Sequence, residues 1–209
     1  MWRHGQTAWN VEERFQGSTD IPLDDTGQMQ ADRAARLLAS LDPDVVVSSD
    51  LGRAQSTAAP LARWCGREVS LDPRLRETFG GSWEGRTSAE IMATDSVDYA
   101  AWRAGADVPA GGGERRSDVA ARMVAAIGGA LTDVPPGGVL VVVTHGGSAR
   151  GALGTMLDLP VDRWSVIGGL ANCCWSVLEE VPGSAIGVGW RLVEHNAGSL
   201  PEPVMSDEE

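Results

Sequence analysis

The sequence contains no lysine, so all 17 of its basic residues are arginines. This absence excludes chemistry that needs a lysine amine, such as a Walker-type phosphate loop or a Schiff base. Arginine remains well suited to binding a phosphate or a carboxylate through two parallel hydrogen bonds. We therefore expect any anion site in this chain to be built from arginine and histidine.

Cysteine and long apolar runs are also scarce. The three cysteines, Cys65, Cys173 and Cys174, contain no CxxC spacing, which argues against a structural disulfide or zinc site and favours a cytoplasmic protein. No stretch reads as a membrane span or a signal peptide. The net charge of −12 argues against nucleic acid or an anionic membrane as a partner. We expect a small-molecule ligand instead.

Short apolar runs alternate with amphipathic stretches, a pattern that predicts an α/β fold. We expect helices over 27–41 with Thr26 as N-cap, from Ser48-Ser49-Asp50 to 65, from 117 to 131, and up to 157. Strands are expected at 45–47, 68–71, 139–143, 173–178 and 190–195, the last two joined through Pro182-Gly183. This order predicts a three-layer α/β/α sandwich with a mostly parallel sheet and an antiparallel edge.

The predicted domain covers residues 1–196 and is followed by a flexible acidic tail over 197–209. Residues 82–116 lack a clean strand pattern but contain two short helical stretches and a glycine-rich turn, and we expect them to form a small cap. In open α/β sheets, ligands bind at the carboxyl ends of the strands. His4, Ser49, Glu77 and His145 each follow an apolar run, so we expect one site at this rim.

Arginines and histidines gather at the expected rim within an acidic protein. Arg3 precedes His4, and Arg53 lies in the first turn of the helix that follows Ser49. A cluster of like charges without a counter-ion is unfavourable, so the grouping indicates a strongly anionic ligand such as a phosphoryl group. A histidine nitrogen can attack phosphorus, and a carboxyl group such as Glu77 can protonate the leaving oxygen.

Four stretches carry a family resemblance. They are Arg3-His4-Gly5-Gln6-Thr7 with Asn10, the run from Ser48 to Thr57, Leu75-Arg76-Glu77, and Thr144-His145-Gly146-Gly147. Together and in this order they resemble the motifs of the histidine phosphatase superfamily, the phosphoglycerate mutase-like proteins. Further stretches, including Gly112-Gly113-Glu114, Asp118–Arg122 and Gly168–Asn172, resemble the actinobacterial members that act on glucosyl-3-phosphoglycerate.

The resemblance implies a role for each matching residue. His4 would accept the phosphoryl group, Glu77 would be the proton donor, and Arg3, Arg53 and His145 would bind the phosphoryl oxygens. Additional expected substrate contacts are Asn10, Gln16, Gly17, Gly146, Trp83 near Glu77, and Arg115. Arg116 and Ser117 lie where a cap loop would touch a sugar or a second anion. The family needs no metal or other cofactor, and we expect none here.

The resemblance implies a phosphoric monoester hydrolase of the histidine acid phosphatase type, acting through a phosphohistidine. Two alternatives stay open. A cofactor-dependent phosphoglycerate mutase is disfavoured because the stretch between Glu77 and His145 is short and lacks lysine. A binding module for phosphorylated ligands would not need Glu77. A homodimer is compatible with the sequence but is not indicated by it.

The start of the chain departs from the family pattern. Only Met1 and Trp2 precede Arg3, whereas the family places a full central strand there. Because two residues cannot form a full ladder and the loss of part of a central strand should cost stability, we expect the natural start to lie upstream of Met1.

Overall fold

The computed structural model describes residues 1–181 and 189–198, which form a six-stranded sheet in the order β3-β2-β4-β1-β5-β6. The first four strands in this order are parallel, and β5 and β6 form the antiparallel edge. This arrangement confirms the predicted fold class. The strands are β1 (Trp2–Arg3), β2 (Val45–Ser48), β3 (Val69–Leu71), β4 (Leu140–Thr144), β5 (Trp175–Glu180) and β6 (Trp190–Ala197).

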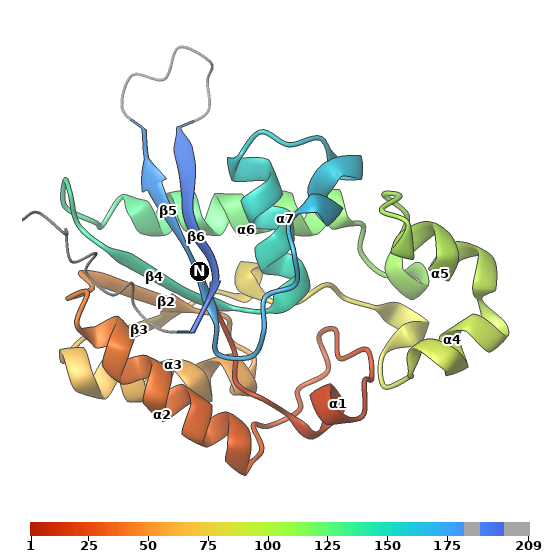
Figure 1. The fold of residues 1–209 in the computed structure, drawn as a ribbon, viewed down its shortest axis with the longest axis horizontal. Helices are drawn as coiled ribbons and strands as arrows, with labels where there is room; N and C mark the ends of the chain where they lie inside the picture. The colour runs from red at the N-terminus through yellow and green to blue at the C-terminus, as the bar shows by residue number, and fades with distance from the viewer. Residues whose placement is uncertain (182–188, 199–209) are drawn as a thin grey trace, which may run out of the picture.

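Helices cover both faces of the sheet (Figure 1). One layer packs α2 and α3 against β2, β4 and β1, and the other packs α6 and α7 against the opposite face. The continuous apolar runs of β2 and β4 are buried on both sides, as expected for parallel strands between two helical layers. The α-helices are α1 (Ala8–Val11), α2 (Asp25–Ala39), α3 (Gly52–Cys65), α4 (Ser88–Thr94), α5 (Ser96–Arg103), α6 (Arg116–Leu131) and α7 (Gly146–Met156).

Two predicted helix starts were wrong. The N-cap of α2 is Asp24, whose side chain accepts a hydrogen bond from the Gly27 amide, and Thr26 lies inside the first turn. Helix α3 begins at Gly52 without a side-chain cap of its own. Instead, the carboxylate of Asp20, from a distant loop, accepts hydrogen bonds from the Gly52 amide. Local sequence does not reveal such a long-range cap.

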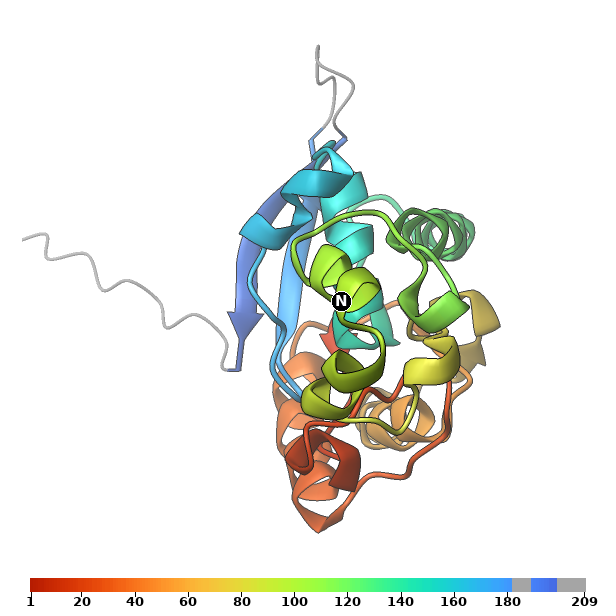
Figure 2. The ribbon, with the colours of Figure 1, turned by 90° about the vertical axis from the view of Figure 1, so that its right-hand side faces the viewer.

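Residues 82–116 carry α4 and α5 at one end of the molecule, away from β5 and β6 (Figures 1 and 2). This segment has a small core of its own, in which Trp83 makes edge-to-face contacts with Tyr99 and Trp102. Phe15, from the loop after α1, packs against the same cluster. Residues 82–116 are thus packed against the loop that follows α1.

Strand β1 is short but central, because Trp2 pairs with Val143 of β4 on one side and Trp175 of β5 on the other. The Trp2 side chain is fully buried in the main core. Burial of this large ring compensates in part for the short ladder. The predicted turn at Pro182-Gly183 and most of the predicted tail lie outside the described residues. Within the described ranges, no helix is long and apolar enough to cross a membrane.

Candidate active site

The two histidines that follow β1 and β4 lie side by side. Because Arg3 and Thr144 are register partners in neighbouring parallel strands, the residues after them emerge at the same edge of the sheet. The ring centroids of His4 and His145 are 5.1 Å apart, and both side chains are almost completely buried. The topology therefore brings together two residues separated by most of the chain.

A hydrogen bond sets the tautomer of His4. Its Nδ1 lies 2.7 Å from the carbonyl oxygen of Gly5, and a carbonyl can only accept, so Nδ1 carries the proton. In the neutral ring this leaves a lone pair on Nε2. Burial, followed by the positive charges of Arg3 and Arg53, lowers the pKa of His4 well below its ordinary value. His4 is therefore neutral near pH 7, as a nucleophile must be.

His145 is held from both ring nitrogens. Arg53 Nε donates to His145 Nδ1 at 3.2 Å, so the neutral ring carries its proton on Nε2 and donates it to Ser49 Oγ at 2.9 Å. Burial and the charge of Arg53 lower the pKa of His145 well below its ordinary value. Both nitrogens of this ring are therefore engaged, and one of them positions Arg53.

The two arginines at the site are bound by main-chain oxygens. Arg53, fully buried, donates to the carbonyl oxygens of Thr19 and Gly17, both at 2.7 Å, and Arg3 donates to that of Leu170 at 2.6 Å. Burial lowers the pKa of Arg53 to about 10, so it keeps its charge at neutral pH. Because carbonyls orient a guanidinium without neutralising it, the positive charge remains available to an anion.

Glu77 caps the helix that follows His145. Its Oε2 accepts from the Gly147 amide at 2.8 Å, and its Oε1 accepts from the Ser148 amide at 2.9 Å. The Gly146 amide, the first of α7, has no hydrogen-bond partner among the described residues. A free amide at a helix N-terminus suits an anion. The carboxyl group of Glu77 and this amide thus lie together beside Arg3, whose Nε is 3.5 Å from the position of a Cβ on Gly146.

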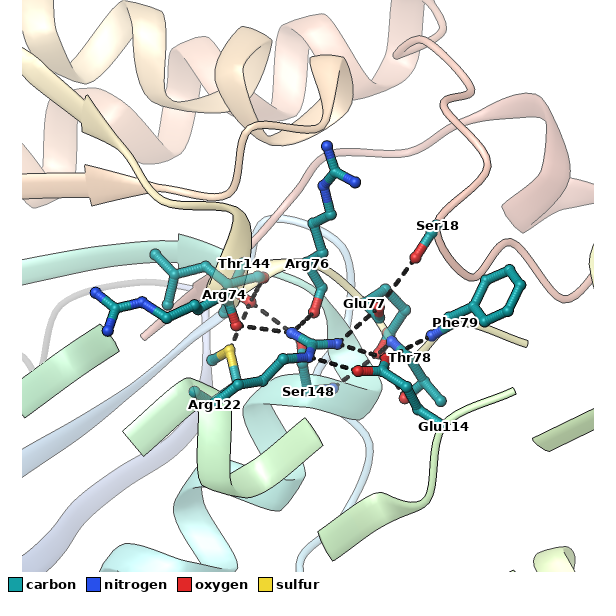
Figure 3. Close-up of polar contacts among 12 residues, drawn as sticks. Ser18, Arg74, Arg76, Glu77, Thr78, Phe79, Glu114, Arg122, Thr144 and Ser148 are labelled. Atoms are coloured by element: carbon teal, nitrogen blue, oxygen red, sulfur yellow. Dashed lines mark hydrogen bonds and ion pairs between the residues drawn. The ribbon is translucent and has the colours of Figure 1, made fainter. Parts of the chain in front are cut away.

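Arg122, on α6, holds the segment that carries Glu77 (Figure 3). It donates to the main-chain oxygens of Arg74, Arg76 and Glu77 at 2.7, 2.6 and 3.0 Å. Its guanidinium also forms an ion pair with Glu114 at 2.8 Å. Glu114 in turn accepts from the Phe79 amide, so one side chain ties α6, the Glu77 segment and the cap together.

Among the remaining predicted contacts, Asn10 is linked to His4 and the Gly17 carbonyl is bonded to Arg53. Asn10 Oδ1 accepts from Asn172 Nδ2 at 3.1 Å, and the same nitrogen donates to the His4 carbonyl at 3.0 Å. Gln16 is buried, and its Oε1 has no partner within the described part of the chain. Gly17 adopts φ +55°, and a Cβ there would lie 2.1 Å from Glu84 Oε1. Only glycine lets this loop offer its carbonyl to Arg53.

Two predicted substrate contacts do not reach the site in this structure. Trp83 is completely buried in the cap core, where its Nε1 donates to Asp95 at 2.7 Å. Its aromatic face is used for packing, so it does not line the site. Arg115 is exposed and donates to the Asp107 carbonyl. The guanidinium of its neighbour Arg116 lies over the Trp102 ring instead.

Sequence reasoning gave no role to the side chains of Ser49, Asn172 and Arg122. Ser49 directly follows β2, and Asn172 ends one of the stretches that carry the family resemblance. The positions of these two residues in the sequence therefore indicated that they lie near the site. Arg122 lies within an ordinary amphipathic helix, and nothing in its local pattern indicates that it reaches the Glu77 segment. No group of three His, Cys, Asp or Glu side chains in the described ranges is arranged to hold a metal ion.

A cavity of about 280 Å³ lies between the α1 loop and the cap. Its lining is partly aromatic, with Trp9, Phe15, Tyr99 and Trp102, and partly polar, with Asn10 among the polar residues. Asn10 connects this cavity to His4 through Asn172.

The fold and this histidine–arginine–glutamate site define a class of protein. Residues 1–196 match the model of the histidine phosphatase superfamily (branch 1), and the chain belongs to this family. The chain is 40% identical to glucosyl-3-phosphoglycerate phosphatase of Mycolicibacterium vanbaalenii, over 95% of this chain and 94% of that protein. A probable phosphoglycerate mutase of Cronobacter sakazakii is 36% identical, over 95% of this chain and 91% of the other.

A solved structure agrees with the sequence relatives. The structure of mycobacterial glucosyl-3-phosphoglycerate phosphatase in complex with VO3 superposes with a TM-score of 0.87 at 40% identity. The match covers 94% of this chain and 97% of the other. These matches confirm the predicted family resemblance and the predicted similarity to glucosyl-3-phosphoglycerate phosphatases.

Proposed function

We propose that this protein is a phosphomonoesterase that works through a phosphohistidine at His4. The observation that carries the proposal is the state of His4: a neutral ring whose Nε2 has no hydrogen-bond partner among the described residues, beside the charged side chains of Arg3 and Arg53. Nucleophile and electrostatic clamp are thus both present before substrate binds, which is what phosphoryl transfer requires of a protein.

In the first step, a bond forms between His4 Nε2 and phosphorus while the ester P–O bond breaks. Arg3, Arg53 and the Gly146 amide stabilise the negative charge on the phosphoryl oxygens. His145 joins them after it exchanges a hydrogen bond to Arg53 or Ser49, since a dianion beside the ring favours its protonated form. Asn10, Gln16 and the Gly17 loop complete the wall of the site.

Glu77 handles the proton in both steps. The departing alkoxide takes a proton from the Glu77 carboxylic acid. A water molecule then attacks phosphorus, the N–P bond breaks, and the Glu77 carboxylate accepts the proton that the water loses. The position of Glu77 at the start of α7, next to Gly146 and Arg3, supports this role.

The substrate that we propose is a small phosphomonoester, with glucosyl-3-phosphoglycerate as the first candidate because the similar phosphatases carry that name. The cavity between the α1 loop and the cap gives space for a sugar, and its aromatic lining suits the apolar face of a pyranose ring. We further propose that residues 82–116 act as the cap and that residues 1–196 form one domain.

The decisive experiment measures phosphate release with and without EDTA, together with trapping of the intermediate. We expect EDTA-resistant hydrolysis of p-nitrophenyl phosphate and glucosyl-3-phosphoglycerate, and an acid-labile, base-stable phosphoprotein after rapid quench. His4→Asn removes the nucleophilic ring nitrogen while keeping a polar side chain, and should abolish both signals. Full activity in His4→Asn would overturn the proposal. His195→Asn is the matched control, because within the described residues His195 bonds Ser176 and the Gly168 carbonyl and none of the predicted site residues.

A mutase is the second candidate, supported by the similarity to a probable phosphoglycerate mutase. A mutase retains the phosphoryl group and forms the isomeric phosphoglycerate when primed with a bisphosphate. We expect release of inorganic phosphate without isomer formation, because the chain has no lysine to bind a substrate carboxylate between Glu77 and His145. Quantifying both products by NMR separates the two activities, and no turnover of either kind would indicate a binding module.

Three finer assignments belong to this proposal. We place the enzyme with the histidine acid phosphatases by mechanism, so its activity should not require a metal. The three cysteines are free, and burial raises the pKa of Cys173 to about 12, which suits a reducing cytoplasm. Light scattering of the purified protein will decide between a monomer and the homodimer that the sequence leaves open.

A further inference from the structure

Glu84, in the proposed cap of residues 82–116, reaches the loop between α1 and α2. Its Oε1 accepts from the Ser18 amide at 2.9 Å, and its Oε2 accepts from the Thr19 hydroxyl. The residue before it, Trp83, is completely buried in the small aromatic core of the cap. The backbone that carries Glu84 is therefore fixed by the cap, while its half-buried carboxylate is bound to the loop.

The loop that Glu84 holds is the one that orients Arg53. The carbonyl oxygens of Gly17 and Thr19, on either side of Ser18, accept from the two terminal nitrogens of Arg53, both at 2.7 Å. The loop lies tightly against the carboxylate, since a Cβ on Gly17 would lie 2.1 Å from Glu84 Oε1. A movement of this carboxylate therefore moves the peptide groups that direct the guanidinium.

This support leaves the charge of Arg53 available. Within the described residues Arg53 forms no ion pair, because the Glu84 carboxylate is bound by neutral donors of the loop. Arg53 Nε donates to His145, and the three bonds to His145, Gly17 and Thr19 leave further N–H groups of the guanidinium for an anion. A carboxylate in direct contact would fix the guanidinium but would also neutralise it.

We propose that Glu84 is a positioning residue, which sets the direction of the Arg53 guanidinium through the loop 17–19 and so couples the position of the cap to the phosphoryl clamp. The inference rests on the phosphatase function above and adds to it a residue that does not touch the substrate. The same loop adjoins the acid, because Ser18 Oγ lies 3.5 Å from the Glu77 carbonyl oxygen (Figure 3). Without Glu84, Arg53 keeps its charge but loses its alignment.

Calorimetric titration with orthovanadate tests this role, because vanadate adopts the five-coordinate geometry of a phosphoryl group in transfer and its binding needs no turnover. We expect Glu84→Ala to weaken vanadate binding and to lower kcat for p-nitrophenyl phosphate, each by about 10-fold or more. In Glu84→Gln one oxygen remains for the Ser18 amide, and the side-chain amide can donate to the Thr19 hydroxyl. Both quantities should then stay within about 3-fold of the wild type.

Glu90→Ala is the matched control within the cap. Glu90 accepts from the Thr87 amide, the Thr87 hydroxyl and Arg14, so it has three donors, as Glu84 has with the Gly80 amide included. We expect Glu90→Ala to lower stability in urea while it keeps the vanadate affinity. Unchanged vanadate affinity in Glu84→Ala overturns the inference, as does an equal loss in Glu90→Ala. A loss in Glu84→Gln as large as in Glu84→Ala contradicts positioning by hydrogen bonds.

If Glu84→Ala fails to fold, Thr19→Val decides. This variant removes the hydroxyl that reaches Glu84 and keeps the carbonyl that binds Arg53. Vanadate binding should weaken by about 3-fold, as expected for one lost hydrogen bond in the support of the loop, and unaltered binding overturns the inference. A wild-type protein that binds vanadate but does not hydrolyse p-nitrophenyl phosphate rejects the phosphatase function, whereas the calorimetric comparison of the variants still tests Glu84.

Discussion

Arg122 holds Glu77 by its main chain: the guanidinium Nη2 donates to the Glu77 carbonyl oxygen at 3.0 Å, while the carboxylate points to α7 (Figure 3). The same guanidinium fixes the carbonyls of Arg74 and Arg76. The carboxyl group that we assign as the proton donor is therefore aimed by a helix on the far side of its own loop.

We predict that Arg122→Met lowers kcat by about 10-fold or more and destabilises the fold by about 2–4 kcal/mol. Four acceptors lose a charged donor in this variant, and buried acceptors left unpaired are costly. The activity loss should be larger for an alkyl phosphate than for p-nitrophenyl phosphate, because only the alkoxide needs a well-placed acid. An equal loss for both substrates would show that Arg122 supports the fold alone. Arg33→Met is the exposed control.

Glu77→Gln should separate the roles of acid and helix cap. The side-chain oxygen of the introduced glutamine can still accept from one amide of α7, whereas the proton donor is lost. We expect kcat for an alkyl phosphate to fall by about 100-fold or more and kcat for p-nitrophenyl phosphate to fall far less. Stability in urea should fall by only about 1–2 kcal/mol. Glu90→Gln, an exposed carboxylate at the start of α4, is the control and should leave the kinetics unaltered.

The surroundings of two glycines, Gly27 and Gly128, lead to opposite steric predictions for replacement by alanine. A Cβ on Gly27 would lie 2.1 Å from the Gln6 carbonyl oxygen, because the start of α2 packs directly on the backbone after His4. Gly27→Ala should therefore destabilise the protein by several kcal/mol, on the order of 3, and displace the His4 loop. In the matched variant Gly128→Ala nothing lies within 4 Å of the added carbon, on the helix α6. That variant should gain about 0.5–1 kcal/mol, and a loss of similar size in both would contradict the steric argument.

The buried histidine pair predicts a pH dependence of stability. The pKa values of His4 and His145 are lowered below 6.5 in the folded protein, chiefly by burial, so the unfolded chain binds more protons below that pH. The free energy of unfolding should therefore rise with pH up to about 6.5 and gain nothing from this pair above it. Each histidine contributes a slope of at most about 1.4 kcal/mol per pH unit.

Urea unfolding at several pH values between 5 and 8 measures this effect together with that of the Met1 ammonium, whose pKa burial lowers to about 5. The lowered carboxylate pKa values of Asp50, Asp72 and Glu114 act at lower pH, because the ordinary values of these groups are 3.8 and 4.5. His4→Asn removes one of the two titrating rings, so the difference in stability between it and the wild type should shrink as pH falls from 6.5 to 5. A difference that stays constant over this interval would refute the assignment.

The parallel core could be predicted from the sequence because its signals are local. The valine runs of β2 and β4 lie between helices with an apolar face, and burial on both sides leaves few other arrangements. The position of the histidine pair followed from the same signals, since both residues directly follow strands. Strand β1 is different: two residues carry no periodicity, and only the motif that follows them indicated a strand.

Contacts that depend on tertiary geometry could not be predicted. Trp83 is near Glu77 in sequence, but the turn at Gly80 and Gly81 directs its ring into the cap core. The interactions of Arg122 and Asp20 span 45 and 32 positions along the chain, so local patterns contain no trace of them. The second ring nitrogen of His145 was also unpredictable, because Ser49 reaches it only once β2 and β4 are paired.

The place of β1 in the sheet has a consequence for synthesis on the ribosome. His4 is made long before β4 and β5, yet β1 finds its two neighbours only in these late strands. Until they have been made, His4 has no neighbouring strand to hold it, since pairing over such a separation is late and slow. A nascent chain that stops before β5 therefore lacks one of the two strands that hold β1, and the segment that carries His4 is fixed in the sheet only after that strand has been made.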